Sequence, residues 1–253
     1  MKRALGSLFG GLLALGVAAV PAAGAPQQMW TANYPLASGG QVEVINIQGS
    51  ISVEGWDRAE VELTVLKTGV QELGQSDVSI AVEPRPNALR VRTVYLPGAE
   101  SSIQVDYRLR VPRQVVLEAL HTVNGDIVVR DVEGAVEAHT LNGDIEETGV
   151  AGSLVARTLN GDVRVSLRRL PEPGGRVQLE SVNGDLTLRL PADAAADLEL
   201  STVAGRIESP LLVETRSPGS DTRLRTRLGR GGIPILMRTI RGSIRLAASE
   251  GLL

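Results

Sequence analysis

Carboxylates recur at a fixed position of a repeated motif, and a row of carboxylates can bind a cation. The motif is Asn-Gly-Asp, and its four copies end in Asp126, Asp144, Asp162 and Asp185. If the copies stack, these side chains form a column of oxygen atoms, the ligand type that calcium prefers. In the alternative, structural role, Asn and Gly accept the dihedral angles of a turn and Asp accepts hydrogen bonds from backbone N–H groups. We favour the structural role and expect no metal ion or cofactor, because further copies of the motif carry Arg206 and Ser243 instead of Asp.

The two histidines of the chain share the spacing of the motif. His121 and His139 are 18 residues apart, as are the first three Asp residues. A metal site needs a third ligand, and the next residue at this spacing is Arg157, whose charge repels a cation. We therefore expect both histidines to be solvent-facing strand residues.

Other catalytic arrangements are not supported by the residue types. Glu146 and Glu147 are adjacent carboxylates, but neighbouring residues of a β-strand point to opposite faces and cannot act on one bond. The sequence has no cysteine, nucleophile elbow, phosphate-binding loop or zinc signature. Aromatic residues make up 2% of the chain and none follows Tyr107, so the repeats lack side chains on which bases or sugars stack. We expect a protein that is not an enzyme and does not bind nucleic acid.

The repeated motif also defines the elements that carry these residues. Each Asn-Gly-Asp follows a Thr or Ser and an aliphatic residue, and precedes another aliphatic residue. The turn residues are Asn124, Gly125, Asn142, Gly143, Asn160, Gly161, Asn183 and Gly184. Degenerate copies occur at 46–51, 202–207 and 239–244. The flanking segments alternate between apolar and polar residues, so each turn joins two β-strands that have one buried face.

Two all-β architectures fit a unit of about 18 residues with two strands and two turns. In a parallel β-solenoid, or β-helix, successive rungs stack about 4.8 Å apart and equivalent residues form columns. In an antiparallel β meander or sandwich, each Asn-Gly is a hairpin turn, which this dipeptide favours. Stacking predicts columns that repeat in residue type, as Thr122, Thr140 and Thr158 do. We therefore favour the solenoid, with antiparallel capping strands at its ends.

The chain divides into an N-terminal targeting segment and one β-strand-repeat domain. Residues 1–25 have the pattern of a signal peptide, because Lys2 and Arg3 precede an apolar stretch and small residues follow it. We expect an exported protein with no transmembrane span in the mature chain. The domain, residues 26–253, is expected to contain irregular N-terminal strands at 26–115, regular repeats at 116–210 and C-terminal capping strands at 211–253.

Three features together resemble a known family: the segment 44–56, the Thr-aliphatic-Asn-Gly-Asp turns, and the closing segment 231–244. They are similar to those of the bacterial putative-adhesin family, exported β-strand-repeat proteins with a domain of unknown function. The resemblance covers roughly residues 40–248. It implies a β-helical body and a location outside the cytoplasm, and it transfers no catalytic residues.

These observations lead to a functional hypothesis. We expect an exported, non-enzymatic protein with a structural or adhesive role at the bacterial cell envelope. Outward strand residues such as Glu137, Arg164, Thr187 and Arg189 would contact an envelope protein or a surface glycan. The alternatives are a carbohydrate-active β-helix enzyme and an envelope-stress accessory protein that binds another exported protein.

Overall fold

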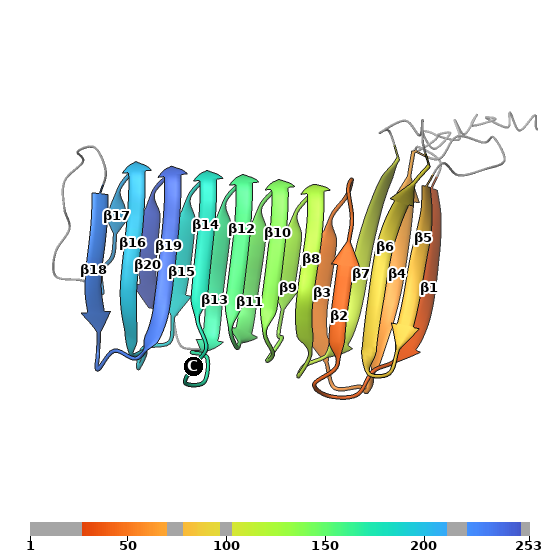
Figure 1. The fold of residues 1–253 in the computed structure, drawn as a ribbon, viewed down its shortest axis with the longest axis horizontal. Coiled ribbons are helices and arrows are strands. Elements are labelled where there is room, and N and C mark those ends of the chain that lie inside the picture. Colours follow the sequence, from red (N-terminus) through yellow and green to blue (C-terminus); the bar gives the residue numbers. More distant parts are fainter. Residues whose placement is uncertain (1–26, 70–77, 97–102, 212–221, 249–253) are drawn as a thin grey trace, which may run out of the picture.

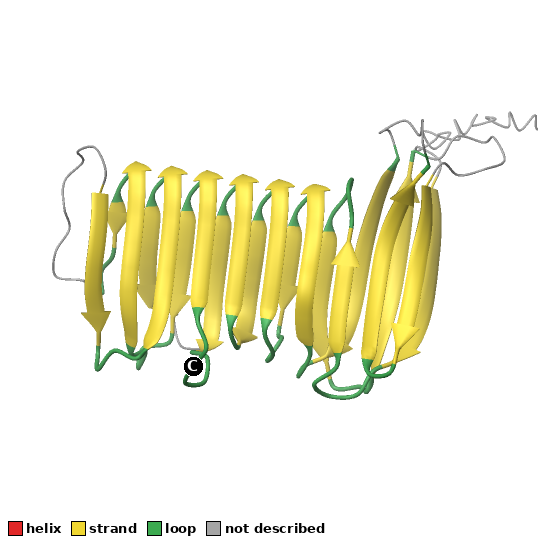
Figure 2. Ribbon diagram, viewed as in Figure 1, coloured by secondary structure: helices red, strands yellow, loops and turns green. Residues whose placement is uncertain are grey.

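The structure is a computed structural model that describes residues 27–69, 78–96, 103–211 and 222–248. Within these ranges the chain forms twenty β-strands and no helix (Figure 2). The strands form two ten-stranded sheets that face each other (Figure 1). Sheet A contains, in spatial order, β1 (Gln27–Pro35), β4 (Glu60–Thr68), β7 (Gln104–Pro112), β3 (Ile51–Trp56), β9 (Ile127–Arg130), β11 (Ile145–Ala151), β13 (Val163–Arg169), β15 (Leu186–Leu190), β20 (Ile244–Ala248) and β17 (Ile207–Glu208). Sheet B contains β18 (Thr222–Leu228), β16 (Ala196–Ala204), β19 (Ile233–Arg241), β14 (Val177–Asn183), β12 (Leu154–Asn160), β10 (Val136–Asn142), β8 (Val116–Asn124), β2 (Gln41–Ile45), β6 (Ala88–Tyr95) and β5 (Val78–Arg85).

The repeats stack as parallel rungs, each made of one strand of sheet B and one strand of sheet A. In sheet B, β10 pairs in parallel with β8 and β12, and Thr140 lies between Thr122 and Thr158. In sheet A, β11 pairs in parallel with β9 and β13. The predicted solenoid with rungs of about 18 residues is confirmed, and the antiparallel meander is wrong.

The spatial order of the rungs departs from their order in the sequence at both ends of the stack. The rung β6–β7 lies outside β2–β3, which pairs with β8–β9 on its other side. At the opposite end, β19–β20 lies between β14–β15 and β16–β17. The parallel rungs that come first and last in the sequence are therefore both interior rungs.

Among the described strands, antiparallel strands cover both sheets at one end of the stack and sheet B at the other. At one end, β5 pairs with β6, while β4 pairs with β7 and β1 with β4. At the other end, β18 pairs with β16. The predicted antiparallel caps are thus present. Among the described strands, segment 211–253 contains the cap β18 and the parallel rung β19–β20, and segment 26–115 contains two parallel rungs besides its antiparallel strands.

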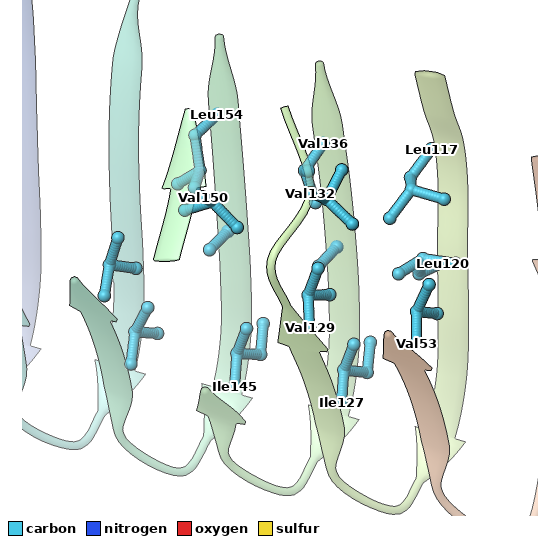
Figure 3. Close-up of a cluster of buried hydrophobic side chains, with 14 of the residues drawn as sticks. Val53, Leu117, Leu120, Ile127, Val129, Val132, Val136, Ile145, Val150 and Leu154 are labelled. Atoms are coloured by element: carbon cyan, nitrogen blue, oxygen red, sulfur yellow. The ribbon is translucent and has the colours of Figure 1, made fainter. Parts of the chain in front are cut away.

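Aliphatic side chains fill the space between the two sheets (Figure 3). Inward-facing residues alternate with outward-facing ones along each strand, so that Ile127, Val129 and Ile145 are fully buried. The buried aromatic Tyr107 lies in the N-terminal part, where its hydroxyl oxygen is 2.6 Å from that of Thr93. The regular repeats thus pack mainly on aliphatic residues, without an aromatic side chain.

Candidate functional site

The Thr-aliphatic-Asn-Gly-Asp turns lie together along one edge of the stack, which we call the motif edge. Each turn connects the end of a sheet B strand to the start of a sheet A strand, as Asn124 and Ile127 do for β8 and β9. Because the rungs are in register, every position of the motif forms a column at rung spacing. The role of each position follows from its contacts with the neighbouring rung.

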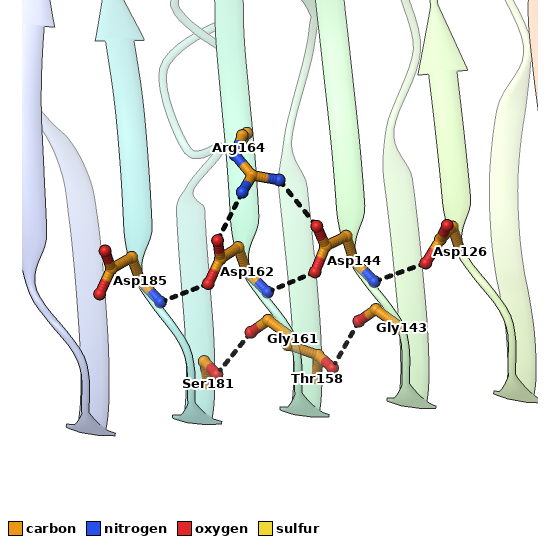
Figure 4. A network of polar contacts seen from close by, with 9 residues as sticks. All are labelled: Asp126, Gly143, Asp144, Thr158, Gly161, Asp162, Arg164, Ser181 and Asp185. Atoms are coloured by element: carbon orange, nitrogen blue, oxygen red, sulfur yellow. Dashed lines mark hydrogen bonds and ion pairs between the residues drawn. The ribbon is translucent and has the colours of Figure 1, made fainter.

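The Thr or Ser side chain points inward and bonds to the neighbouring turn. The Thr158 hydroxyl donates to the carbonyl oxygen of Gly143 at 3.0 Å, and the Ser181 hydroxyl donates to that of Gly161 at the same distance (Figure 4). The same bond is made by Thr122, Thr140, Thr202 and Thr239. These hydroxyls satisfy carbonyl groups that would otherwise be buried without a partner.

The glycine is required because the turns approach one another closely. Gly143 has a φ of +156°, and a Cβ atom there would lie 2.1 Å from the carbonyl oxygen of Gly125. At Gly161 the corresponding distance, to the oxygen of Gly143, is 2.0 Å. No other residue type fits this column without moving the rungs apart.

The asparagines form a ladder of side-chain amides. The Nδ2 atom of Asn142 donates to Oδ1 of Asn124 at 2.8 Å, and Asn160 and Asn183 repeat this bond with the Asn before them. On the next rung Arg241 replaces Asn and donates to Asn183 at 3.2 Å. The ladder gives the motif edge a row of oriented amide groups.

The aspartates accept backbone hydrogen bonds across the rungs. The Oδ1 atom of Asp126 accepts from the N–H of Asp144 at 2.8 Å, Asp144 from Asp162, and Asp162 from Asp185 (Figure 4). Asp185 accepts from Ser243, which carries the motif on β19–β20. These are the bonds that the structural interpretation of the Asp column predicts.

Arg164 on sheet A bridges two of these carboxylates. Its guanidinium donates to Oδ2 of Asp144 at 2.8 Å and to Oδ2 of Asp162 at 2.5 Å (Figure 4). Partial burial acts to raise the pKa of Asp144. The hydrogen bonds from Arg164 and from the Asp162 N–H, with the charge of Arg164, outweigh this and hold the pKa below its usual value. Among the described residues, no group of three or more His, Asp or Glu is placed to hold a metal ion.

The two histidines lie side by side on adjacent rungs of sheet B. Their ring centroids are 4.8 Å apart, and Arg157 is the next residue of the column. His139 is 2.9 Å from a carboxylate oxygen of Glu137. Burial, and then the neighbouring His139, lowers the pKa of His121. Both histidines alternate with buried residues and therefore lie on the outer face of sheet B, where neighbouring side chains leave them partly exposed.

Glu146 and Glu147 point to opposite faces of sheet A, as their adjacency predicts. Glu146 is exposed, 3.8 Å from Arg130. Glu147 is completely buried, and neither of its carboxylate oxygens has a hydrogen-bond partner within the described residues. Burial raises its pKa to about 8. This buried carboxyl group was not identified from the sequence, although period-two alternation from the apolar Ile145 indicates its inward direction.

The four outward residues named from the sequence occupy different faces. Glu137 lies on the outer face of sheet B, whereas Arg164, Thr187 and Arg189 lie on that of sheet A. Arg164 and Thr187 are neighbours on β13 and β15. Sheet A thus offers a polar surface of repeated strands.

Surface hollows lie over both sheets, and none gathers a set of convergent acids. One over β8, β10 and β12 contains Glu118 and Glu137. Another, over β16, β18 and β19, contains Asp197 and Glu199, which are paired with arginines. A third, near Trp56, contains two acids as well. Each of these hollows is lined by two carboxylates.

This arrangement of rungs can be compared with known proteins. The Toastrack DUF4097 family matches residues 37–244, which includes every parallel rung up to the start of β20. The chain belongs to the Toastrack DUF4097 family. The resemblance to the putative-adhesin family is confirmed. Like the sequence, the family description assigns this toastrack domain no reaction.

Solved structures match this chain at low sequence identity, and one of them superposes well enough to share its fold. A putative cell adhesion protein from Clostridium sporogenes superposes with a TM-score of 0.51 at 10% identity, covering 88% of this chain and 100% of that chain. A putative adhesin from Bacteroides fragilis gives a TM-score of 0.41 at 11% identity, covering 87% and 97%. No curated protein matches the sequence. None of the residues that the structure describes belongs to a helix that could cross a membrane.

Proposed function

We propose that this toastrack protein is exported and acts without catalysis, as a structural or adhesive binding protein at the bacterial cell envelope. The observation that carries the proposal is the regular display of outward side chains at rung spacing on nearly flat faces. A rigid row of equivalent groups suits contacts that are individually weak and collectively strong.

The side-chain chemistry supports binding over catalysis. Glycoside hydrolysis needs two carboxylates that flank one bond, with different protonation states. Glu146 and Glu147 lie on opposite faces, and Asp197 and Glu199 are held by Arg227, Arg225 and Arg238. Neither of these two carboxylate pairs therefore combines proximity with an open approach for a sugar.

The N-terminal segment supports export. Lys2 and Arg3 precede the apolar residues 4–20, and small residues follow Pro21, a pattern that secretion signals share. The similar protein from Clostridium sporogenes carries the name of a putative cell adhesion protein, which agrees with an envelope role.

The outer face of sheet A is the proposed contact surface for an envelope protein or a surface glycan. Arg164, Thr187 and Arg189 form a polar group there, and Arg189 and Arg164 are exposed. Arg164 is already held by Asp144 and Asp162, so its guanidinium is fixed before a partner arrives. A fixed donor loses less conformational entropy on binding.

Retention of envelope components on the immobilised protein tests this function. Arg189→Glu reverses a charge on sheet A, and Arg230→Glu makes the same change at the distant turn between β18 and β19. We expect the wild-type protein and Arg230→Glu to retain the same glycan or protein, and Arg189→Glu to lose it. Release of cleaved saccharide from the envelope fraction, or equal retention by all three proteins, would contradict the proposal.

A further inference from the structure

A continuous line of aliphatic side chains lies on the outer surface of sheet B, beside the motif edge. It is formed by the aliphatic residue between Thr or Ser and Asn in the four Asn-Gly-Asp motifs and by the residues at the same position of the neighbouring rungs. Their side chains point outward because that of the preceding residue points inward. We call this line the aliphatic ridge. Its members are Val94, Ile47, Val123, Leu141, Leu159, Val182, Ile240 and Val203.

The register of sheet B makes the ridge straight and unbroken. Leu141 and Leu159 are neighbours because Thr140 pairs with Thr158 and Asn142 with Asn160. Val94 continues the line beyond Ile47, since Ile45 pairs with Arg92. Eight rungs spaced about 4.8 Å apart give a ridge roughly 34 Å long.

The ridge contains most of the exposed large hydrophobic side chains of the described residues. Nine large hydrophobic side chains of the described residues are exposed, and all of them except Met29 and Leu96 belong to the ridge. The ridge residues among them are 37% to 50% exposed. Strand propensity favours β-branched residues but does not require Leu141 and Leu159 at solvent-facing positions. A concentrated exposed apolar line of this kind indicates an interaction surface.

The charges beside the ridge indicate what it contacts. The adjacent column on sheet B contains Arg92, His121, His139, Arg157 and Arg238, with Glu180 as its one carboxylate. On the other side lie the uncharged Asn ladder and Arg241. The carboxylate partners of His139 and Arg238, Glu137 and Glu199, lie one column further from the ridge. The columns next to the ridge are therefore basic or neutral; Arg92 and Arg157 are paired with Glu83 and Glu180, and the Asp column lies beyond the Asn ladder.

We propose that the aliphatic ridge docks on a lipid surface with anionic headgroups, with its side chains in the interface and the basic column at the phosphates. Partly buried aliphatic groups with flanking arginines are the combination that interfacial binding uses. The hollows on sheet B are not lined by ridge residues, so a small molecule has no concave site there. A line one side chain wide also offers far less than the roughly 800 Å² per partner that a stable dimer buries. The proposal rests on the envelope location proposed above and not on the partner of sheet A.

Site-specific fluorescence on the full-length chain tests the proposal. The sequence contains no cysteine, so Leu159→Cys and Thr148→Cys each provide one attachment point for a polarity-sensitive dye. Leu159 lies on the ridge, and Thr148 is exposed on the opposite sheet. On phosphatidylcholine vesicles that contain phosphatidylglycerol, we expect a blue shift and a several-fold emission increase at position 159 and no change at position 148. Vesicles of phosphatidylcholine alone should give a weaker response.

A second variant removes two aliphatic side chains of the ridge and leaves the core unchanged. Leu141→Ser with Leu159→Ser should lower the fraction sedimenting with anionic vesicles about tenfold, since two partly exposed leucines are lost. Thr148→Ser with Ser166→Thr on sheet A is the matched control and should bind normally, and all proteins should melt alike. Equal dye responses at both positions, as anchoring through residues 1–25 would give, would overturn the proposal. An emission increase with protein concentration in the absence of vesicles would also overturn it, in favour of a second copy of the chain. Failure of the wild-type protein to bind anionic vesicles, while it still retains envelope components, would reject the ridge proposal and leave the proposed function standing.

Discussion

The Thr158 hydroxyl donates a hydrogen bond to the carbonyl oxygen of Gly143, 3.0 Å away on the neighbouring rung. The two residues are 15 positions apart, and the same bond joins six pairs of rungs. It joins the inward-facing Thr or Ser of one sheet B strand to the motif turn of the neighbouring rung. The motif is therefore a device for holding rungs together as much as a turn signal.

Removing this hydroxyl should destabilise the stack. We expect Thr158→Val to lower the free energy of unfolding by about 1–2 kcal/mol, because the Gly143 carbonyl loses a donor in a buried position. Thr158→Ser keeps the donor and should cost less. Urea denaturation followed by circular dichroism measures both. Equal stability of the Val variant and the wild type would show that the bond has no net effect.

A side chain at the stacked glycines should be much more disruptive. Gly143→Ala places a Cβ atom 2.1 Å from the Gly125 carbonyl oxygen, and relief requires the rungs to separate. We expect a loss of about 3 kcal/mol or more, or failure to fold. Gly174→Ala is the control, because Gly174 also has a positive φ, +92°, but nothing lies within 4 Å of the added atom. Similar losses in the two variants would show that the dihedral angle, and not crowding, dominates.

The buried carboxyl of Glu147 should make stability depend on pH. Burial raises its pKa from 4.5 to about 8, so the folded state retains a proton that the unfolded chain has lost over this interval. The contribution of Glu147 to the free energy of unfolding should be highest below pH 4.5, fall between pH 4.5 and 8, and stay constant above pH 8. The total loss should be a few kcal/mol. Glu147→Leu should abolish this slope, whereas Glu146→Leu on the exposed face should keep it. Denaturation midpoints across this range check both, and an unchanged slope in Glu147→Leu would contradict the assignment.

Calcium should not stabilise the Asp column. The Oδ1 atoms already accept backbone N–H groups, and Arg164 occupies Oδ2 of Asp144 and Asp162. We expect no heat in calorimetric titration and the same melting temperature in calcium and in chelator. A rise in melting temperature that Asp144→Asn abolishes would establish a cation site instead.

The columns of the repeat could be read from the sequence because stacking repeats chemistry as well as spacing. Thr140 and Asn142 recur at 18-residue intervals since each bonds to its counterpart or to the neighbouring turn. The same periodicity cannot reveal which rungs are neighbours. In the sequence, the copy at 239–244 follows the copy at 202–207. In the structure it lies between that copy and the copy at 183–185, because any copy of the motif can stack on any other.

The direction of some side chains was the second feature that was not predicted from the sequence. The sequence analysis treated the aliphatic residue before Asn as part of a strand and did not assign it a face. The inward hydroxyl of Thr140 determines that Leu141 points outward, which becomes evident only when the acceptor, the Gly125 carbonyl, is known. The burial of Glu147 was missed for a related reason, since a carboxyl group is not expected among valines.

The interior position of β19–β20 has a consequence for how the chain is assembled. Strands β14 and β16 cannot come together with their final neighbours until residues 233–248 have been synthesised, because the last rung is inserted between them. Folding from the N-terminus during synthesis can build the earlier rungs but must leave a gap at this point. A chain that is still leaving the ribosome thus remains open, and closure of the stack waits for residues 233–248.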